Sequence, residues 1–390
     1  MTDWREDLTG IPYGRLGIIP MPGCLEFAKK IDRYIIDWRN AQDQEYKDSI
    51  IFDGYWKDSF LMDVSCPRFG TGEGKATICE SVRGVDIFII CDCFNYGVTH
   101  KMYGIEFPTS PDEHFANLKR VISATAGKAR RITVIMPMLY EGRQHKRSSR
   151  ESLDCALALQ ELTSLGVNNI ITFDAHDARV QNAIPSSGFE NVSPVYQMIK
   201  ALVRNADGLK VDPEHLMIVS PDEGGMSRCI YYATVLGVEL GMFYKRRDYS
   251  KIVDGRNPIL AHEFLGDNVD GKDVIVVDDM ISSGDSMIDV ARQLKARNAK
   301  RIFICTSFGL FCNGLERFDE AYEKGIFDKI FTTNLIYQTP ELLSRPWYAS
   351  VQMEKYCAHI INTVNNDRSL SPLLDPKGKI DDYLKKYGLR

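Results

Sequence analysis

The sequence predicts an α/β protein whose sheets are largely parallel. Short apolar runs at 85–92, 169–173 and 274–277 alternate with helical patterns such as 148–166. Apolar runs without polar alternation are typical of strands buried on both faces, as in parallel sheets. Strands that alternate with helices along a chain form such sheets. Polar groups also gather where the apolar runs end, which is where open α/β sheets place their sites.

Length and composition limit the classes of function. The chain has 390 residues, of which 44% are apolar and 26% charged, and its formal net charge is −5. This length suits two domains, and the composition is ordinary for a globular protein. The negative charge indicates neither nucleic acid nor a membrane surface as a partner. Ten cysteines without CxxC spacing, no signal-peptide core and no apolar run of about 20 residues favour a cytoplasmic protein with reduced thiols.

The first part of the chain carries little chemistry. Apolar residues at helical spacing predict one helix, with Leu25, Ala28, Ile31 and Ile35 on one face. The polar and aromatic stretch 38–60 is assigned no chemistry. The GTGEGK sequence at 70–75 is not a P-loop, because only three residues separate its outer glycines and Ala76 replaces the required Ser or Thr.

Between residues 85 and 250 the chain repeats a pattern of strand followed by polar cluster. The clusters are Arg143 to Arg147, Asp174 to Asp177, Asp222 to Glu223, and Lys245 to Arg247. A basic cluster at the carboxyl end of a strand is placed for phosphates, although a solvated charged loop would look the same. His176 lies between two carboxylates, so a ligand role and a structural role are both open. A capped amphipathic helix is expected at 148–166.

The most informative stretch is VIVVDDMISSGDS at 274–286. An apolar strand is followed by Asp278 and Asp279, then by small residues, a helical pattern and a second strand at 301–308. The start of a helix offers free N–H groups to a phosphate. Hydrogen bonds to a charged group contribute about 1.5–3 kcal/mol each, against about 0.3–1 for the helix dipole.

The amides and hydroxyls of this turn should therefore dominate the binding of a phosphate. Ser283 and Ser286 supply the hydroxyls, and Gly284 lets the backbone approach closely. The acid pair suits neutral hydroxyls or a metal. A ligand with a phosphate at one end and a diol at the other, such as ribose 5-phosphate, fits both halves. The alternative is an ordinary strand-to-helix turn with solvated aspartates.

This turn resembles the ribose-phosphate loop of the type I phosphoribosyltransferase fold. Over residues 69–370 the chain also resembles the ribose-phosphate diphosphokinase (PRPP synthase) family. The resemblance is carried by ESVRGVDIFII, MPMLYEGRQ, FDAH, VSPDEGG, YKRRD, DDMISSGDS and KIFTTNLI in that order. It implies two phosphoribosyltransferase-like domains, each a largely parallel sheet flanked by helices.

The resemblance also implies a domain plan and an assembly. The N-terminal domain would span 1–192, with an unmatched insertion near 36–65. A phosphoribosyltransferase-type domain would span 193–360, and a tail at 361–390 would pack back on the N-terminal domain. Members of the family form oligomers, so a homo-oligomer is expected.

The implied reaction transfers the β,γ-diphosphoryl group of ATP to the 1-hydroxyl of ribose 5-phosphate, with Mg²⁺ as cofactor. Ribose 5-phosphate would be bound by Asp278, Asp279, Ser282, Ser283, Gly284, Asp285 and Ser286. ATP would be bound by Phe69, Glu73, Arg143, Gln144 and His145, the first two from a neighbouring subunit. His176 and Asp222 would lie at the Mg²⁺ sites. Lys245 and Arg247, on a flexible loop, would be catalytic.

Two residues depart from the pattern of the family on the ATP side. Thr71 stands where an acidic residue is usual, and His145 stands where Asp is usual. The departures leave open a catalytically inactive relative that binds or regulates a partner. A phosphoribosyltransferase that joins a base to PRPP is a further alternative, which the YKRRD segment and the length of two domains disfavour.

Overall fold

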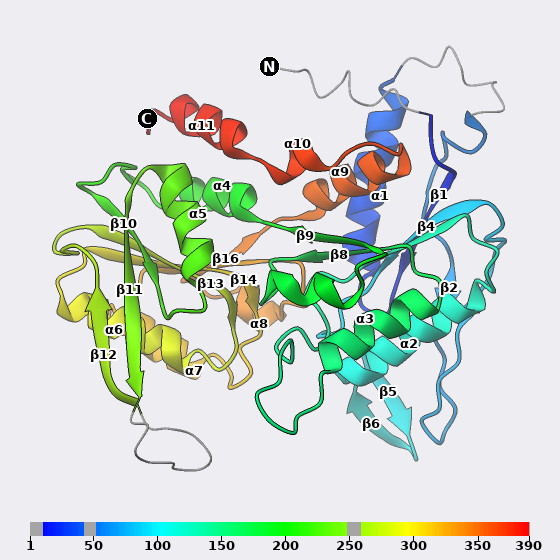
Figure 1. Ribbon diagram of the computed structural model, residues 1–390, viewed down its shortest axis with the longest axis horizontal. Coiled ribbons are helices and arrows are strands. Elements are labelled where there is room, and N and C mark those ends of the chain that lie inside the picture. The colour runs from blue at the N-terminus through cyan, green and yellow to red at the C-terminus, as the bar shows by residue number, and fades with distance from the viewer. Residues whose placement is uncertain (1–10, 43–51, 248–258, 390) are drawn as a thin grey trace. The chain divides into compact units, whose positions relative to one another are not determined.

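The structure is a computed structural model that describes residues 11–42, 52–247 and 259–389 (Figure 1). Two compact units make up the chain. Unit 1 comprises Met1–Ser193, Leu335–Tyr337 and Gln352–Leu374, and unit 2 comprises Pro194–Asn334, Gln338–Val351 and Asp375–Arg390. Among the described helices, none combines the length and the apolar character that a membrane span requires.

Unit 1 is built on a five-stranded sheet in which all neighbouring strands are parallel. The strand order is β1-β4-β7-β8-β9. The strands are β1 (Arg15–Pro20), β4 (Val85–Ile90), β7 (Arg131–Ile135), β8 (Asn169–Phe173) and β9 (Gly188–Val192). The helices of this unit are α1 (Leu25–Asn40), α2 (Pro111–Ala124), α3 (Asp154–Ser164), α9 (Glu354–Asn365) and α10 (Ser371–Leu374).

Two small ribbons and a short 3₁₀ helix complete unit 1. The ribbons pair β2 (Val64–Ser65) with β3 (Thr77–Ile78), and β5 (Thr99–Met102) with β6 (Ile105–Pro108), both antiparallel. The 3₁₀ helix is η3 (Ala178–Ala183).

Unit 2 contains a seven-stranded sheet that is parallel except at one edge. Its order is β12-β11-β10-β13-β14-β15-β16, and only β11 and β12 are antiparallel. The strands are β10 (Leu216–Ser220), β11 (Glu239–Arg247), β12 (Ile259–Leu265), β13 (Asp273–Ile281), β14 (Arg301–Gly309), β15 (Lys329–Thr333) and β16 (Tyr348–Val351). The helices are α4 (Val195–Asn205), α5 (Met226–Leu236), α6 (Asp285–Ala296), α7 (Glu316–Glu323), α8 (Pro340–Leu343) and α11 (Lys377–Lys386).

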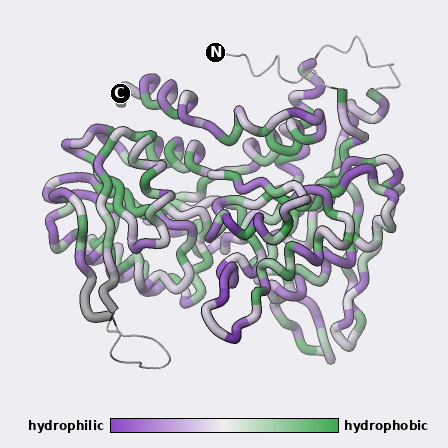
Figure 2. Tube along the Cα trace, in the orientation of Figure 1, coloured by the Kyte–Doolittle hydropathy of each residue, from purple (hydrophilic) through white to green (hydrophobic). Residues whose placement is uncertain are grey.

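The predicted fold class is confirmed. The central strands β4 and β10 are buried along their whole length, as their unbroken apolar sequences predict. Figure 2 shows hydrophobic residues concentrated along the strands and hydrophilic ones in the loops. Each sheet therefore forms the centre of its own core.

One predicted helix differs in its bounds from the structure. The helix expected at 148–166 begins only at Asp154, and its N-cap residue Leu153 makes no side-chain capping bond. The helix that does carry a capping box is α2, in which the Ser110 hydroxyl accepts from the Glu113 N–H and the Glu113 carboxylate accepts from the Ser110 N–H. Polar residues before Asp154 thus belong to the loop after β7 and lengthen it.

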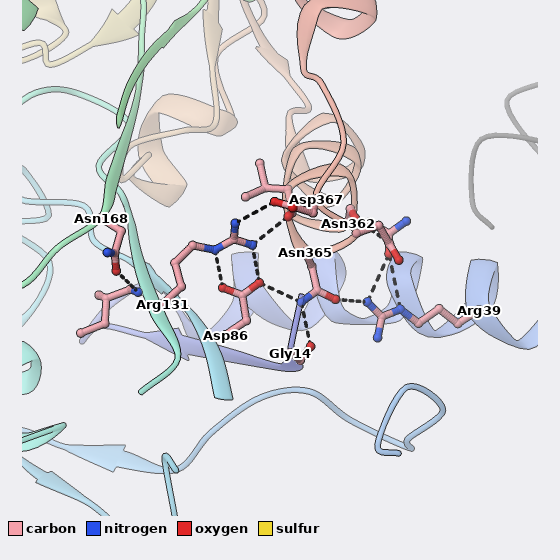
Figure 3. Close-up of polar contacts among 11 residues, drawn as sticks. Gly14, Arg39, Asp86, Arg131, Asn168, Asn362, Asn365 and Asp367 are labelled. Carbon is pink, nitrogen blue, oxygen red and sulfur yellow. Dashed lines mark hydrogen bonds and ion pairs between the residues drawn. The ribbon is translucent and has the colours of Figure 1, made fainter. Parts of the chain in front are cut away.

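A buried polar network attaches α9 to the sheet of unit 1 (Figure 3). The Asn365 amide donates to Asp86 Oδ2 at 2.9 Å and accepts from Arg39 Nη2 at 2.8 Å. Arg131 donates hydrogen bonds to both oxygens of the Asp86 carboxylate at 2.7–2.8 Å. Arg39 is 1% exposed, and burial lowers its pKa to about 10, so it stays charged at neutral pH. Because a buried charge must be paired, α9 is an integral part of unit 1.

Candidate functional site

The acid pair lies within the second half of β13. The neighbouring strand β10 pairs with β13 only as far as Val276, whereas β14 continues alongside, with Asp278 opposite Thr306. The sequence placed the acid pair after the strand, and this is corrected: the strand runs to Ile281 because β14 keeps pairing with it. On the β10 side, however, Asp278 and Asp279 lie beyond the end of the sheet.

Burial sets the charge of this acid pair. Asp278 Oδ1 accepts from the Asp279 N–H at 2.9 Å and lies 3.7 Å from Arg228 Nη1. Burial, and next the neighbouring Asp279, raise the pKa of Asp278 to about 8, although Arg228 opposes this. Asp279 is only 4% exposed. Near neutral pH the unliganded site therefore carries a proton that a bound cation or a hydrogen-bond donor can displace.

The turn after β13 has a backbone that only glycine accommodates. Gly284 has φ +87°, and a Cβ there would lie 2.0 Å from the ring of Phe318, which is fully buried. Helix α6 begins at the next residue, so the turn leads directly into a helix N-terminus. Asp285 was predicted to bind ribose 5-phosphate. Its carboxylate instead pairs with Arg317 of α7.

The loop after β10 lies beside the acid pair. Asp222 Oδ1 accepts from the Gly224 N–H at 2.9 Å, and the Ser220 hydroxyl donates to the Asp222 carbonyl at 2.7 Å. A Cβ on Gly225 would lie 2.9 Å from Ser220 Oγ and 3.5 Å from Asp278 Oδ1. The close approach allowed by this glycine brings the Asp222 loop against the end of β13.

The predicted catalytic cations lie on a strand. The sequence placed Lys245 and Arg247 on a flexible loop, and this is corrected: their backbone belongs to β11, with Lys245 opposite His262 and Arg247 opposite Ile259 of β12. Antiparallel pairing with β12 extends the strand to this point (Figure 1). The loop that the sequence predicted after Arg247 lies outside the described residues.

In unit 1, the loops after β7 and β8 meet. The His145 ring lies 5.3 Å from the His176 ring between centroids, and His145 Nε2 lies 3.4 Å from Asp177 Oδ2. The pKa of Asp177 lies far below its usual value, mainly because Arg179 donates hydrogen bonds to its carboxylate. Gln144, predicted to contact ATP, donates to the Ser152 carbonyl at 2.8 Å. This hydrogen bond joins two parts of the loop between β7 and α3.

Phe69 and Glu73, the predicted adenine residues, share one tight turn. The Phe69 N–H donates to the Glu73 carbonyl at 2.8 Å, and the Thr71 hydroxyl donates to Glu73 Oε2 at 2.9 Å. The Phe69 side chain is 58% exposed. A hairpin that the sequence did not predict, β5–β6, supports the turn through a hydrogen bond from the Tyr103 N–H to the Gly70 carbonyl at 2.9 Å.

The predicted residues thus form separate groups within each unit. Unit 2 brings together Asp222, the acid pair and the glycine turn, and unit 1 brings together His145 and His176. Sequence reasoning missed Arg228, which approaches Asp278 from the first turn of α5. Its signal was a basic residue at a helix N-terminus, where the dipole disfavours it.

Family models match both units. The model for the N-terminal domain of ribose phosphate pyrophosphokinase matches residues 16–166, and the model for the phosphoribosyl transferase domain matches residues 190–345. The chain belongs to the ribose-phosphate pyrophosphokinase family. The predicted family is therefore confirmed.

Relatives and a solved structure agree with this assignment. Ribose-phosphate pyrophosphokinases from Vibrio parahaemolyticus and Shewanella oneidensis are each 28% identical to this chain. They cover 81% and 80% of it, and 92% and 91% of their own lengths. The structure of phosphoribosylpyrophosphate synthetase from Mycobacterium smegmatis superposes with a TM-score of 0.70 at 20% identity, covering 90% of this chain and 99% of that one. The last comparison supports the fold shared by the family.

Proposed function

We propose that this protein transfers the β,γ-diphosphoryl group of ATP to the 1-hydroxyl of ribose 5-phosphate, giving PRPP and AMP. The observation that carries the proposal is the end of β13, where an acid pair, a glycine turn and a helix N-terminus follow one another. The acid pair suits the hydroxyls of a sugar phosphate, and the glycine turn with the helix N-terminus suits its phosphate. The enzymes that this chain resembles are named for the same reaction.

The ribose side needs hydrogen-bond acceptors for hydroxyls and donors for a phosphate. Asp278 and Asp279 supply carboxylate oxygens for the ribose hydroxyls. The amides at the start of α6, with Ser283 and Ser286, supply donors for the 5-phosphate. With its phosphate and its diol both held, the sugar presents its anomeric hydroxyl in a fixed position.

The ATP side needs positive charge. The 1-hydroxyl attacks the β-phosphorus, the bond between the α- and β-phosphoryl groups breaks, and AMP leaves. Such a transfer depends on positioning and charge neutralisation more than on covalent help from the protein. Lys245 and Arg247 supply the charge in this proposal, and Arg143 binds the triphosphate. Phe69 and Glu73 hold the adenine of a neighbouring subunit in a homo-oligomer.

The two expected metal positions differ in how well they suit Mg²⁺. Asp222 offers carboxylate oxygen, which Mg²⁺ prefers, whereas His176 offers imidazole nitrogen. Among the described residues, no three His, Cys, Asp or Glu side chains gather to hold a metal ion by themselves. A metal bound through one or two side chains and the phosphates of ATP fits that donor set, and would neutralise phosphate charge.

One assay tests the proposal. The protein is incubated with ATP, ribose 5-phosphate and Mg²⁺, and AMP and PRPP are measured together, with Asp278→Asn as the comparison. Equal amounts of AMP and PRPP from the native protein, and a large loss in the variant, are expected. Binding of both substrates without either product would favour the catalytically inactive binding subunit instead.

A further inference from the structure

The β5–β6 hairpin projects from unit 1 (Figure 1) and has an unusual residue at its tip. Met102 pairs with Ile105, so the turn between the two strands consists of Tyr103 and Gly104. Both turn residues have positive φ, +50° at Tyr103 and +80° at Gly104. Such turns favour Asn followed by Gly, because a bulky side chain strains the left-handed backbone. Tyr103 is 77% exposed, so packing within the chain does not explain an aromatic residue there.

The tip of the hairpin lies against the turn that carries Phe69. The Tyr103 N–H donates to the Gly70 carbonyl at 2.9 Å. A Cβ on Gly72 would lie 2.7 Å from Met102 Sδ, so the Met102 side chain packs where that glycine leaves room. Phe69 is itself 58% exposed. Two adjoining turns therefore present two exposed aromatic side chains on one part of the surface.

A charged network holds these two turns together. Arg68 Nη1 donates to the Gly72 carbonyl at 2.8 Å and lies 3.2 Å from Glu113 Oε1. His100 Nε2, on β5, lies 3.2 Å from the same carboxylate oxygen. The side chains of Arg68 and His100 are only 10% and 11% exposed. A surface that is already ordered loses less entropy when a ligand binds, so this arrangement suits recognition.

Thr71 increases the importance of the aromatic side chains. It stands where the family usually has an acidic residue, and its hydroxyl donates to Glu73 Oε2 at 2.9 Å. The turn therefore has one carboxylate fewer with which to accept a hydrogen bond from the amino group of adenine. Stacking of a base on an aromatic ring does not need that acceptor.

We propose that Tyr103 extends the aromatic surface that Phe69 presents to the base of ATP, and that it favours purine over pyrimidine nucleotides. A purine offers a larger ring system for stacking than a pyrimidine does. The role of Tyr103 rests on the proposed function, in which Phe69 and Glu73 hold the adenine of a neighbouring subunit. It adds a third residue, from the β5–β6 hairpin, to the side of that site which selects the base.

Binding of α,β-methylene-ATP with Mg²⁺ tests this role without turnover, because the bond that breaks in the reaction is replaced in this analogue. Calorimetry on the full-length protein compares it with α,β-methylene-CTP. Tyr103→Asn should weaken binding of the ATP analogue about fivefold or more, and should lower the preference for it over the CTP analogue about threefold or more. Tyr103→Phe keeps an aromatic ring and should stay within about twofold of the native affinity.

The Asn substitution separates recognition from structure. Asn suits a turn residue with positive φ, so Tyr103→Asn should keep or raise the melting temperature while it loses nucleotide affinity. Tyr387→Ala is the control, because Tyr387 is also an exposed aromatic residue, at 47%, and follows α11 in unit 2. This variant should bind both analogues as the native protein does.

Native affinity of Tyr103→Asn for the ATP analogue would overturn the proposal, as would an equal loss for both analogues. A changed oligomeric mass in light scattering would also overturn it, since the hairpin would then act through assembly. The same holds if the native protein does not bind the ATP analogue. A native protein that binds the analogue but makes no PRPP would contradict the proposed function alone, and the comparison of variants would still decide the role of Tyr103.

Discussion

At the scale of single residues, burial decides the chemistry of the site more than residue type does. The acid pair was evident from the sequence because two adjacent aspartates followed an apolar run. The elevated pKa of Asp278 was not, since burial raises it, and Arg228, which lies 50 positions earlier in the chain, limits the rise. Likewise, the bond from Thr71 to Glu73 shows that a residue departing from the family pattern still takes part in the turn.

Asp278→Asn should stabilise the unliganded protein increasingly as pH rises. The folded pKa of about 8 exceeds the ordinary 3.8, so the folded protein binds a proton that the unfolded chain has released. The contribution of the Asp278 carboxyl group to the free energy of unfolding is therefore fully present below about pH 4, and it is lost as pH rises towards 8. Thermal unfolding of variant and native protein at pH 5, 7 and 9 measures the difference. An exposed carboxylate, Asp270→Asn, is the control, and an unchanging difference in Tm would contradict the prediction.

Lys245→Ala should lower kcat by two or more decades without unfolding the protein. One contact that stabilises charge in a transition state contributes about 3–4 kcal/mol. Initial rates of PRPP formation at saturating substrates measure the effect, and circular dichroism checks the fold. Lys324→Ala, a surface lysine paired with Glu320, should remain fully active. Near-native turnover by Lys245→Ala would remove this lysine from the mechanism.

At the scale of elements, the sequence predicted the strands better than their ends. An apolar run specifies a buried strand, but where the strand stops depends on its neighbour: β14 extends β13, and β12 extends β11. The β5–β6 hairpin lacks an apolar run, and three of the four residues in its Thr99–Met102 strand are polar. Pairing partners are set by tertiary structure, which a single sequence does not display.

Gly284→Ala should destabilise the protein and weaken ribose 5-phosphate binding. A left-handed backbone costs a residue with a Cβ about 1–2 kcal/mol, and the overlap with Phe318 adds about 1–3. Gly271→Ala separates the two effects, because Gly271 has φ +73° but nothing within 4 Å of the added Cβ. Urea unfolding should therefore show a larger loss for Gly284→Ala, and calorimetry with ribose 5-phosphate should show reduced affinity for that variant alone. Equal losses of stability would argue against the overlap with Phe318.

At the scale of the whole molecule, the chain returns to unit 1 after building most of unit 2. The sequence indicated two domains, but it did not reveal that residues 352–374 complete the first unit. The decisive contacts join residues more than 270 positions apart, such as Asn365 with Asp86. Composition and periodicity are local properties, so they carry no signal of this pairing. The consecutive boundaries expected at 193–360 and 361–390 stay a prediction.

Asn365→Ala should lower the free energy of unfolding through the buried network. The substitution leaves Arg39 and Asp86 each with one partner fewer, and a buried polar group without a partner costs about 1–3 kcal/mol. Urea unfolding measures the loss. Asn205→Ala, which removes an exposed amide at the end of α4, should stay within about 0.5 kcal/mol of the native value. Similar values for the two variants would show that the network contributes nothing net.

The interleaved course of unit 1 has a consequence for synthesis on the ribosome. When residue 193 emerges, Arg39 and Asp86 still lack the helix that will cover them. Translation of 194–351 takes roughly 8–32 s at 5–20 residues per second. During that time Arg39 and Asp86 lack their hydrogen bonds to Asn365. A nascent chain in this condition is a natural client for chaperones that hold incomplete domains, and truncated transcripts would yield protein destined for degradation.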